Sequence, residues 1–311
     1  MANIGFIGLG NMGGPMAANL VKAGEHVRGF DVVPASRETS ARDGVQIVAN
    51  AKSCVENADF VISMLPAGEH VLSVWKDVLP AAHQGALFID CSTIDVASAR
   101  KAHGLAAERG IATLDAPVSG GVGGAKAATL TFMVGGSKHA FERGKPVLER
   151  MGKRVVHCGE AGNGQAAKIC NNMILGISMI AVSEAFVLGE KLGLSHQALF
   201  DVASASSGQC WSLTTYCPVP GPVPASPANN DYKPGFAAAL MLKDLKLARE
   251  AAQSVHADTA LGVQAAEIYE HFAQEGHSGA VLFRDHQARA RAVTPNPIIS
   301  RSRRHRTLPL G

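Results

Sequence analysis

Paired cysteines are absent from this chain. Its six cysteines are scattered, with no CxxC pair among them: Cys54, Cys91, Cys158, Cys170, Cys210 and Cys217. We therefore expect reduced thiols rather than a disulfide framework or a zinc site. The twelve histidines also lack the spacing of metal ligands, and no HExxH motif occurs, so we predict no bound metal.

Signals for a membrane or for export are missing as well. The longest apolar stretch, residues 173–188, contains two serines and Glu184, so we expect no membrane span. The N-terminus runs directly into a strand pattern, without a signal peptide or transit segment. The sequence also holds no internal repeat and no nucleic-acid motif. We expect a cytoplasmic protein without membrane or nucleic-acid partners.

Strong charge of one sign is confined to the end of the chain. Residues 284–311 carry seven arginines and one aspartate, or +6, while the whole chain of 311 residues is +3, so residues 1–283 come to −3. A basic tail on a mildly acidic body is weak support for nucleic-acid binding. An apolar content of 47% and a charged content of 18% are ordinary for a globular protein, and the length predicts two domains.

The patterns that are present begin with a glycine-rich turn. A short apolar strand at residues 3–7 runs into Gly8-Leu9-Gly10-Asn11-Met12-Gly13, and a helix pattern follows. This GxGxxG spacing is typical of dinucleotide binding, because its glycines allow a tight turn, close approach of a pyrophosphate and packing of helix on strand. A second strand ends in Asp31, 18 residues after the last glycine, near the ~20 expected for a carboxylate that binds a ribose 2′-hydroxyl. Such a carboxylate favours NAD over NADP, although Arg37 is close enough to soften the preference; the alternative is that Asp31 only starts a turn.

Strand and helix patterns then alternate. Apolar strands at residues 59–65 and 86–90 are separated by a helical stretch and followed by another. This alternation predicts a parallel, doubly wound sheet. Ligands of such sheets bind at the carboxyl ends of the strands, where Leu65, Pro66 and Thr93 lie. These residues are candidates to line a cofactor, although each could equally be an ordinary loop residue without a ligand.

A further strand leads into Ser119-Gly120-Gly121. Glycines let the backbone approach a ligand closely, and exposed N–H groups beside a serine hydroxyl can bind a carboxylate. The alternative is a flexible surface loop, since Gly123 and Gly124 follow. Two more strands are predicted at residues 129–134 and 154–158.

The organising stretch of the sequence is residues 162–172, which open an apolar helix that continues to about Gly193. A helix that is apolar on most faces is buried. Lys168 and Asn172 lie four residues apart and share one of its faces, where they need polar partners or a polar cleft. Our hypothesis is that this helix joins two domains and that Lys168 is a catalytic acid/base. The alternative is a lysine that snorkels from the start of the helix.

Beyond Gly193 the pattern is helical, without a convincing strand. Six prolines within residues 216–235 predict a loop or polyproline segment, or a linker between domains. A helix then begins near Met241, and Lys243 with Asp244 at its start could be a solvated pair.

In this order, the motifs resemble the β-hydroxyacid dehydrogenase family over roughly residues 3–279. The segments that carry the resemblance are residues 5–31, 115–136, 162–172 and 243–248. Further stretches, within residues 123–133 and 206–221, are most similar to the branch that acts on 3-hydroxyisobutyrate. The resemblance implies an α/β protein with an N-terminal Rossmann domain, its doubly wound parallel sheet, an all-α C-terminal domain and a long interdomain helix.

The resemblance also implies limits for the domains. We predict an NAD-binding Rossmann domain at residues 1–161 and an all-helical substrate and oligomerisation domain at residues 162–283. An aberrant basic tail, disordered by composition, is predicted at residues 284–311. The Pro-rich run then belongs to the helical domain, and the protein assembles as a homodimer or homotetramer.

Roles for single residues follow from the same resemblance. Lys168 is implied as the catalytic acid/base. The implied substrate contacts are Ser119, Gly120, Gly121 and Asn172. The implied NAD contacts are Gly8, Leu9, Gly10, Asn11, Met12, Gly13, Asp31, Leu65, Pro66, Thr93 and Lys243. The implied activity is oxidation of 3-hydroxyisobutyrate to methylmalonate semialdehyde with NAD, a step of valine and hence branched-chain amino acid catabolism.

Two rival functions stay open. One is the same chemistry on another small β-hydroxyacid, such as tartronate semialdehyde/glycerate or serine. The other is a non-catalytic dinucleotide-binding module whose basic tail is a docking arm. The presence of both Lys168 and Asn172 argues against the module, because binding alone needs neither residue.

After Gly279 the sequence departs from the family pattern. A short apolar helix is expected here, but residues 282–289 read LFRDHQAR and an Arg/Pro tail follows. One choice of codons for these residues, shifted by one base, encodes YFAIIKL, which fits the missing helix. Our hypothesis is a frameshift near Val281, which would leave the residues from about 282 without an evolved function. The nucleotide sequence would decide it.

Overall fold

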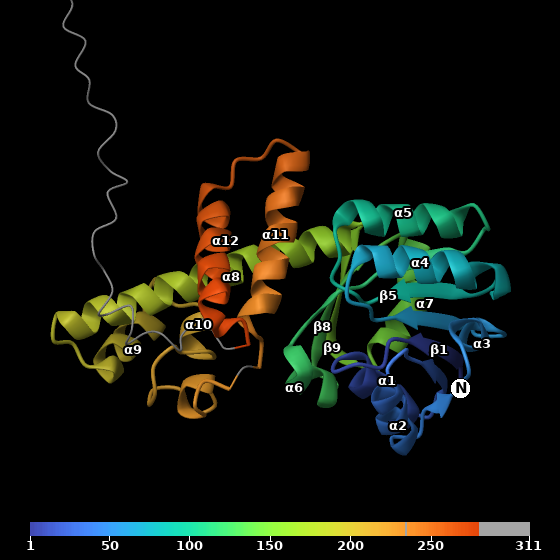
Figure 1. The fold of residues 1–311 in the computed structure, drawn as a ribbon, viewed down its shortest axis with the longest axis horizontal. Helices are drawn as coiled ribbons and strands as arrows, with labels where there is room; N and C mark the ends of the chain where they lie inside the picture. The colour runs from blue at the N-terminus through green and yellow to red at the C-terminus, as the bar shows by residue number, and fades with distance from the viewer. Residues whose placement is uncertain (234, 280–311) are drawn as a thin grey trace, which may run out of the picture. The chain divides into compact units, whose positions relative to one another are not determined.

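The computed structural model of the chain describes residues 1–233 and 235–279 (Figure 1). By their contacts these residues form two compact units, one of residues 1–178 with 235–279 and one of residues 179–233. The predicted basic tail at residues 284–311, and the suggested frameshift near Val281, lie outside the described residues.

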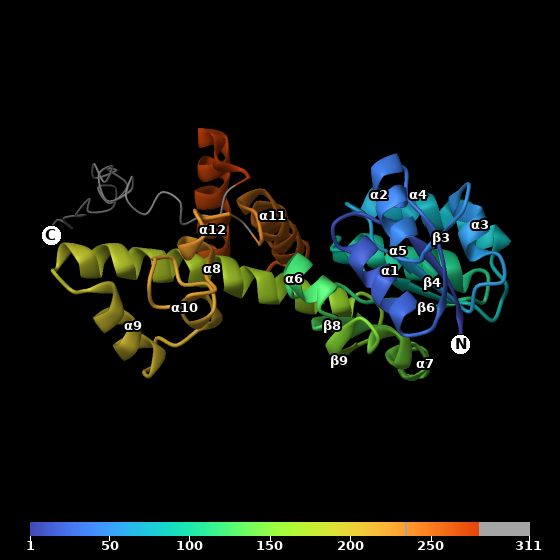
Figure 2. The same ribbon diagram turned by 90° about the horizontal axis from the view of Figure 1, so that it is seen from below.

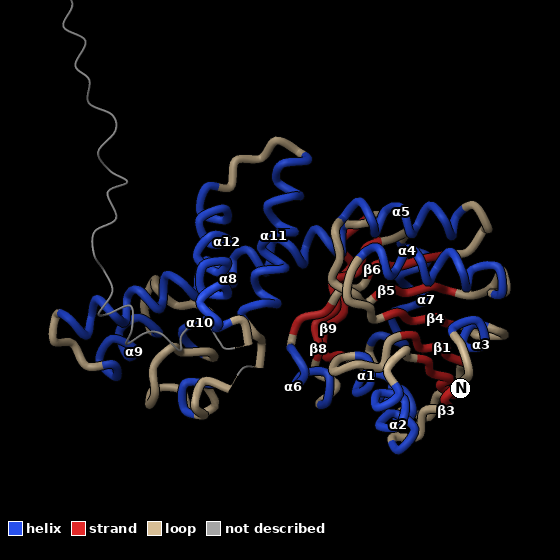
Figure 3. The backbone as a smooth tube through the Cα atoms, in the orientation of Figure 1, coloured by secondary structure: helices blue, strands red, loops and turns tan. Residues whose placement is uncertain are grey.

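The first unit is built on a nine-stranded sheet, drawn in red in Figure 3. Its order is β3-β2-β1-β4-β5-β6-β8-β7, with β9 beside β8. Strands β1 to β6 pair in parallel, while β8 runs antiparallel to β6 and β7 and parallel to β9. The strands are β1 (Asn3–Ile7), β2 (His26–Phe30), β3 (Gln46–Ile47), β4 (Phe60–Ser63), β5 (Leu87–Asp90), β6 (Ala112–Asp115), β7 (Val118–Ser119), β8 (Leu130–Gly135) and β9 (Gly152–Gly159). The strand order reverses direction between β1 and β4, which confirms the predicted doubly wound fold.

Helices cover both faces of this sheet. Along β5, Leu87 and Ile89 pack into the hydrophobic cluster that includes α1 and α7, whereas Phe88 packs into the opposite cluster with α4 and α5. Successive side chains of a strand point to opposite faces, so a strand buried on both sides is apolar throughout. The helices of this part are α1 (Gly13–Lys22), α2 (Pro34–Arg42), α3 (Ala51–Val55), α4 (Gly68–Val78), α5 (Val96–Ala107), α6 (Gly121–Lys126) and α7 (Lys138–Leu148), with a 3₁₀ turn at Leu79–Ala81.

Helix α8 (Asn163–Lys191) is one continuous helix that contributes to both units (Figure 2). This confirms the predicted long helix between the sheet and the helical part. By length and composition alone α8 could cross a membrane, and 33% of its most apolar window is buried. A core helix of a soluble protein passes the same test, so this is weak support for a membrane span.

Two further helices, α11 (Ala238–Ser254) and α12 (Ala260–Phe272), belong to the first unit with the start of α8. Glycines allow the helices to approach closely. A Cβ at Gly176 of α8 would lie 3.0 Å from Leu245 of α11, and a Cβ at Gly262 of α12 would lie 2.9 Å from Met173 of α8. A π-helical turn, Ala273–His277, follows α12.

The second unit holds the end of α8, α9 (His196–Ser204), α10 (Trp211–Thr214) and a 3₁₀ turn at Pro227–Asn229. Its core is formed by Phe186, Leu213, Cys217 and Val219. The last two residues lie in the Pro-rich run, which therefore packs on this helical core and is not a free linker. The described residues beyond Gly193 form no strand, as predicted.

The division by contacts does not fall at residues 161/162. Helix α8 continues through both units, and α11 with α12 groups with the sheet. The domain limits at residues 1–161 and 162–283 stay a prediction. The short elements β3, β7, α3 and α6 were not predicted, because two residues are too few to show the alternation of a strand and five or six too few to show the period of a helix.

Candidate active site

The glycine-rich turn joins β1 to α1. Gly8 has φ +96°, and a Cβ there would lie 2.2 Å from the carbonyl oxygen of Met64. A Cβ at Gly13 would lie 1.9 Å from the carbonyl oxygen of Gly8, whereas at Gly10 it would meet nothing within 4 Å. Packing therefore requires the first and third glycines. The second glycine leaves the backbone open to a ligand, which fits a bound dinucleotide pyrophosphate.

Asp31 follows β2 and turns its carboxylate toward the glycine-rich turn. Oδ2 accepts a hydrogen bond from the N–H of Leu9 and Oδ1 one from the N–H of Val33, both at 2.7 Å. Arg37 donates to the main-chain carbonyl of Asp31 at 2.8 Å, and within the described residues no ion pair joins the two side chains. Each carboxylate oxygen keeps a further lone pair, so a ribose hydroxyl can still bind here.

Lys243 of α11 joins the loops that follow β4 and β5. Its Nζ donates to the carbonyl oxygens of Pro66 and Thr93, at 2.7 Å each. Burial is the main cause that lowers the pKa of Lys243, against the carboxylates of Asp244 and Asp90. The structure thus brings together three residues that were predicted separately. The predicted contacts of Pro66 and Thr93 with a cofactor stay a prediction.

Asp90, at the end of β5, lies beneath these loops and was not singled out from the sequence. It is 2% exposed, and Oδ1 accepts hydrogen bonds from the hydroxyls of Ser63 (2.7 Å) and Ser92 (2.6 Å). The hydroxyl of Ser92 accepts in turn from the N–H of Leu65 at 2.8 Å. Oδ2 has no hydrogen-bond partner among the described residues, and burial raises the pKa of Asp90 to about 6. An acid that ends a buried strand, with a serine two residues later, is the signal that could have identified it.

Lys168 and Asn172 lie on one face of α8, only 6% and 2% exposed. Asp244 of α11, 5% exposed, faces the same point and accepts a hydrogen bond from Nδ2 of Asn172. Burial is the main cause that lowers the pKa of Lys168, while the Asp244 carboxylate acts in the opposite direction. The pKa of Asp244 is raised by burial above all, against Lys168 and Asn172. The suggestion of a solvated Lys243–Asp244 pair is wrong, because Asp244 is buried and forms part of the site.

The Nζ of Lys168 is free to bind a ligand. Across residues 1–233 and 235–279 it makes no hydrogen bond, unlike Lys243 on the neighbouring helix. A buried amine without hydrogen-bond partners loses less by becoming neutral than an exposed one does. The catalytic role of Lys168 stays a prediction.

The stretch Ser119-Gly120-Gly121 spans the end of β7 and the start of α6. Gly120 and Gly121 have φ of +133° and +60°, which side chains rarely adopt, so this turn requires glycine. The amide of Asn19 in α1 donates to the carbonyl oxygen of Ala125 at 2.6 Å and holds α6 in place. No hydrogen bond between described residues joins this stretch to Lys168 or Asn172, so its role toward a substrate stays a prediction.

The start of α8 is held by Asp115, at the end of β6. Oδ1 accepts from the N–H of Gly162 at 2.8 Å and Oδ2 from the N–H of Gln165 at 3.0 Å. Oδ1 also lies 3.0 Å from Nε2 of His103. The first N–H groups of a helix have no partner within the helix, and Gly162 has no side chain to accept from them, so a carboxylate 47 residues away takes this place.

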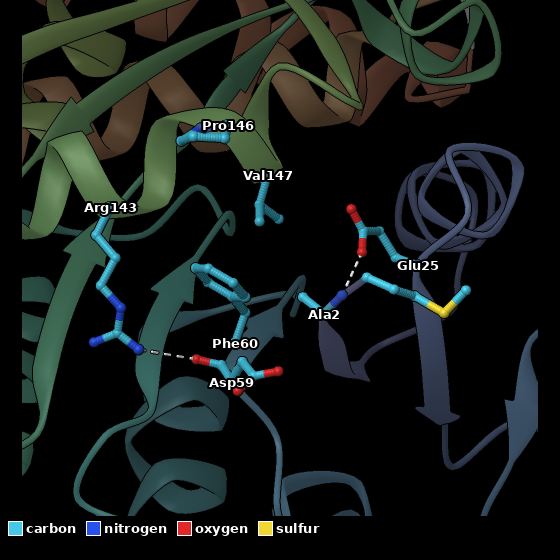
Figure 4. A pocket seen from close by; sticks show the side chains of 8 residues that line it. Ala2, Glu25, Asp59, Phe60, Arg143, Pro146 and Val147 are labelled. Carbon is cyan, nitrogen blue, oxygen red and sulfur yellow. Dashed lines mark hydrogen bonds between the residues drawn. The ribbon is translucent and has the colours of Figure 1, made fainter.

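A pocket at the opposite edge of the sheet contains none of the predicted residues (Figure 4). It is lined by residues at the starts of β1, β2 and β4 and by residues of α7, and Figure 4 shows Arg143 of α7 reaching the carbonyl of Asp59. Ligands of doubly wound sheets bind at the carboxyl ends of the strands. We therefore place the candidate active site at the carboxyl edge, among Thr93, Lys168 and Lys243.

Comparison with known protein families indicates an NAD-binding protein. Residues 3–159 match the family model described as the NAD binding domain of 6-phosphogluconate dehydrogenase. Residues 162–293 match the model described as NAD-binding of NADP-dependent 3-hydroxyisobutyrate dehydrogenase. The second match extends beyond Gly279, where we expected the resemblance to stop.

Similar proteins cover most of the chain. A probable 3-hydroxyisobutyrate dehydrogenase of Mycobacterium tuberculosis is 57% identical over 275 residues, which are 88% of this chain and 94% of that protein. An NAD-dependent L-serine dehydrogenase of Pseudomonas aeruginosa is 46% identical over 281 residues, or 89% and 94% of the two chains. The solved structure of Mycobacterium tuberculosis 3-hydroxyisobutyrate dehydrogenase with L-serine superposes with a TM-score of 0.90 at 55% identity, covering 93% and 99%.

We predict that Asp90→Asn removes a pH dependence of stability. The pKa of Asp90 is raised from 3.8 to about 6 in the folded protein, so the folded chain holds the proton more tightly than the unfolded chain between these values. Relative to the variant, the wild-type free energy of unfolding should fall by roughly 3 kcal/mol as the pH rises through this interval. Urea titrations of both proteins from pH 4 to pH 7 measure it. A difference that stays constant over this range contradicts the prediction.

Proposed function

Because the chain belongs to the 3-hydroxyisobutyrate dehydrogenase family, we propose that it oxidises 3-hydroxyisobutyrate to methylmalonate semialdehyde, with Lys168 as the general acid/base. It is an NAD-dependent oxidoreductase, so the non-catalytic binding module is set aside. The observation that carries the role of Lys168 is a side chain only 6% exposed whose Nζ makes no hydrogen bond within the described residues, beside Asn172 and the Lys243-bound loops. In our proposal this oxidation is a step of valine catabolism.

The chemistry needs a base at the alcohol of the substrate. NAD, when bound, accepts the hydride from the carbon that carries the hydroxyl. The hydroxyl proton must leave at the same time, and a lysine can take it only as the neutral amine. Burial lowers the pKa of Lys168 and makes this form accessible nearer neutral pH. In the reverse direction the ammonium form donates the proton and stabilises the developing negative charge on oxygen.

The carboxylate of the substrate needs donors of its own. Nδ2 of Asn172 carries two hydrogens, and one of them binds Asp244, which leaves the other for the substrate. The hydroxyl of Ser119 and the N–H groups of Gly120 and Gly121 are the other donors in our proposal. The dinucleotide would lie along Gly8–Gly13 and Asp31, with Leu65, Pro66 and Thr93 near the reacting ring.

L-serine is the second candidate substrate. A 46% identical relative is named NAD-dependent L-serine dehydrogenase, and the superposed 3-hydroxyisobutyrate dehydrogenase was solved with L-serine. Both acids have a β-hydroxyl and a carboxylate, and they differ in the substituent between these groups. Steady-state assays with 3-hydroxyisobutyrate, L-serine, glycerate and tartronate semialdehyde decide between them. The substrate with the highest kcat/KM identifies the function, and no turnover of any of the four would contradict the proposal.

We propose further that the enzyme is a cytoplasmic homo-oligomer. Leu188, Leu192 and Val202 in the second unit are 59%, 77% and 65% exposed. Leu188 lies in α8, Val202 in α9 and Leu192 in the turn that joins them, and an exposed apolar patch is typical of a protein interface. They support a homodimer or homotetramer assembled through this unit.

Lys168→Ala should lower turnover by several orders of magnitude. The variant loses the group that removes the hydroxyl proton, but none of the contacts that we assign to NAD. The dissociation constant for NADH, measured by fluorescence, should therefore stay within about threefold of the wild-type value. A group that acts only in the transition state does not contribute to binding of the cofactor. Retention of more than a tenth of the wild-type kcat would remove Lys168 from the mechanism.

Asp244→Asn should move the pH profile of oxidation to lower pH. The carboxylate of Asp244 favours the ammonium form of Lys168, so its removal lowers the pKa of that amine further. Asparagine keeps an oxygen that can accept from Asn172. The rising limb of kcat against pH measures the shift. A limb that stays in place, or moves to higher pH, shows that Asp244 does not act on Lys168 in this way.

Asp31→Asn should reduce the preference for NAD over NADP. The variant keeps an acceptor for the N–H of Leu9, but it loses the negative charge that repels a 2′-phosphate. The ratio of kcat/KM for NAD to that for NADP should fall by about tenfold or more, as expected for a charged hydrogen-bond partner. An unchanged ratio would place the ribose elsewhere.

A further inference from the structure

Gln165, in the first turn of α8, is buried and has no part in the chemistry above. It is 0% exposed, and both ends of its side-chain amide are bonded to backbone. Oε1 accepts from the N–H of Ile94 at 3.1 Å, and Nε2 donates to the carbonyl of Ser92 at 2.7 Å. Only one orientation of the amide satisfies an N–H on one side and a carbonyl on the other. The side chain is therefore fixed.

These two bonds lie on either side of Thr93. The carbonyl of Thr93 is the group that accepts from Lys243, and the hydroxyl of Ser92 donates to Asp90. The loop after β5 is thus held from three directions, by Lys243, Asp90 and Gln165. Of these three, only Gln165 comes from the helix that carries the proposed base.

Gln165 also shares a helix face with the proposed catalytic groups. Lys168 and Asn172 follow it by three and seven residues, which is the spacing of neighbours on one face. Its own N–H is bound by Asp115, which fixes the start of α8 on the end of β6. One residue therefore connects the helix of the base, the end of β6 and the loop that contains Thr93.

We infer that Gln165 is a positioning residue, which sets the distance between Lys168 and the cofactor-side loop by holding the backbone around Thr93. The inference rests on the proposed function, because it takes Lys168 as the base and Thr93 as a neighbour of the cofactor. A base and a cofactor must meet the same carbon and its hydroxyl, and a misplacement of about 1 Å costs about a hundredfold in rate.

The main test compares Gln165→Met with Arg143→Met. Methionine keeps the length of glutamine but cannot form either hydrogen bond. Arg143 is a matched control, because it also bonds two backbone carbonyls, those of Asp59 and Gly85, at the other edge of the same sheet. Figure 4 shows the bond to Asp59. Gln165→Met should lower kcat about 10- to 100-fold per folded molecule, and Arg143→Met should leave it within about twofold.

A second variant, Gln165→Glu, adds a measurement, the pH dependence of kcat, that a purely structural role of Gln165 would not change. A protonated glutamic acid can accept from Ile94 with one oxygen and donate to Ser92 with the other, whereas an ionised one cannot donate. The ratio of variant to wild-type kcat should therefore be highest at low pH and fall as the pH rises. For Gln165→Met the same ratio should stay flat.

Binding of NADH separates this inference from the proposed function. Gln165→Met should weaken NADH binding, measured by fluorescence, because the loop around Thr93 loses two of its anchors. If the wild type oxidises none of the hydroxyacids, the proposed function fails, and NADH binding still reports on Gln165. The inference is overturned if Gln165→Met leaves NADH affinity and kcat within about twofold, or if Arg143→Met lowers both to the same extent.

Discussion

The position of Lys168 depends on one interaction, the binding of the Asp115 carboxylate to the first turn of α8. The helix starts in a buried place with a glycine before it, so its free N–H groups need an acceptor from elsewhere. A negative charge at a helix N-terminus is also favoured by the helix dipole. Because the carboxylate belongs to the end of β6, the start of α8 is fixed on the edge of the sheet where dinucleotides bind. Lys168 and Asn172 are then carried to that edge by the helix itself.

Charged groups of both signs are buried at this edge. Two lysines, Lys168 and Lys243, meet two acids, Asp244 and Asp90. Burial lowers the pKa of the amines and raises that of the acids. Lys168 and Asp244 each moderate the shift of the other, whereas hydrogen bonds from Ser92 and Ser63 moderate that of Asp90. Lys243 donates two hydrogen bonds to backbone carbonyls, whereas Nζ of Lys168 donates none within the described residues and remains available for a proton. The same type of residue thus serves two purposes, according to what surrounds its amine.

Local spacing was enough to predict much of the fold and part of the site. The GxGxxG turn, the acid at the end of the second strand and the shared face of Lys168 and Asn172 all depend on residues close in sequence. The suggestion that Asp244 is solvated was wrong, because its burial depends on the contact between α11 and α8. Its partner on α8, Asn172, lies 72 residues away in the sequence. Asp90, Asp115 and Gln165 escaped notice for the same reason, since their partners lie on other elements. The two-residue strands β3 and β7 are defined only by their hydrogen-bonded pairing with neighbouring strands, and they show no alternating pattern in the sequence.

The central claim is that the amine of Lys168 meets the substrate hydroxyl beside the nicotinamide. A crystal structure of the enzyme with both NAD and 3-hydroxyisobutyrate, or L-serine if that is the better substrate, tests it directly. We expect Nζ of Lys168 within about 3 Å of the β-hydroxyl oxygen, as a general base requires, with the reacting carbon facing the nicotinamide. A complex with both ligands bound, in which Nζ points away from the hydroxyl, would contradict the account.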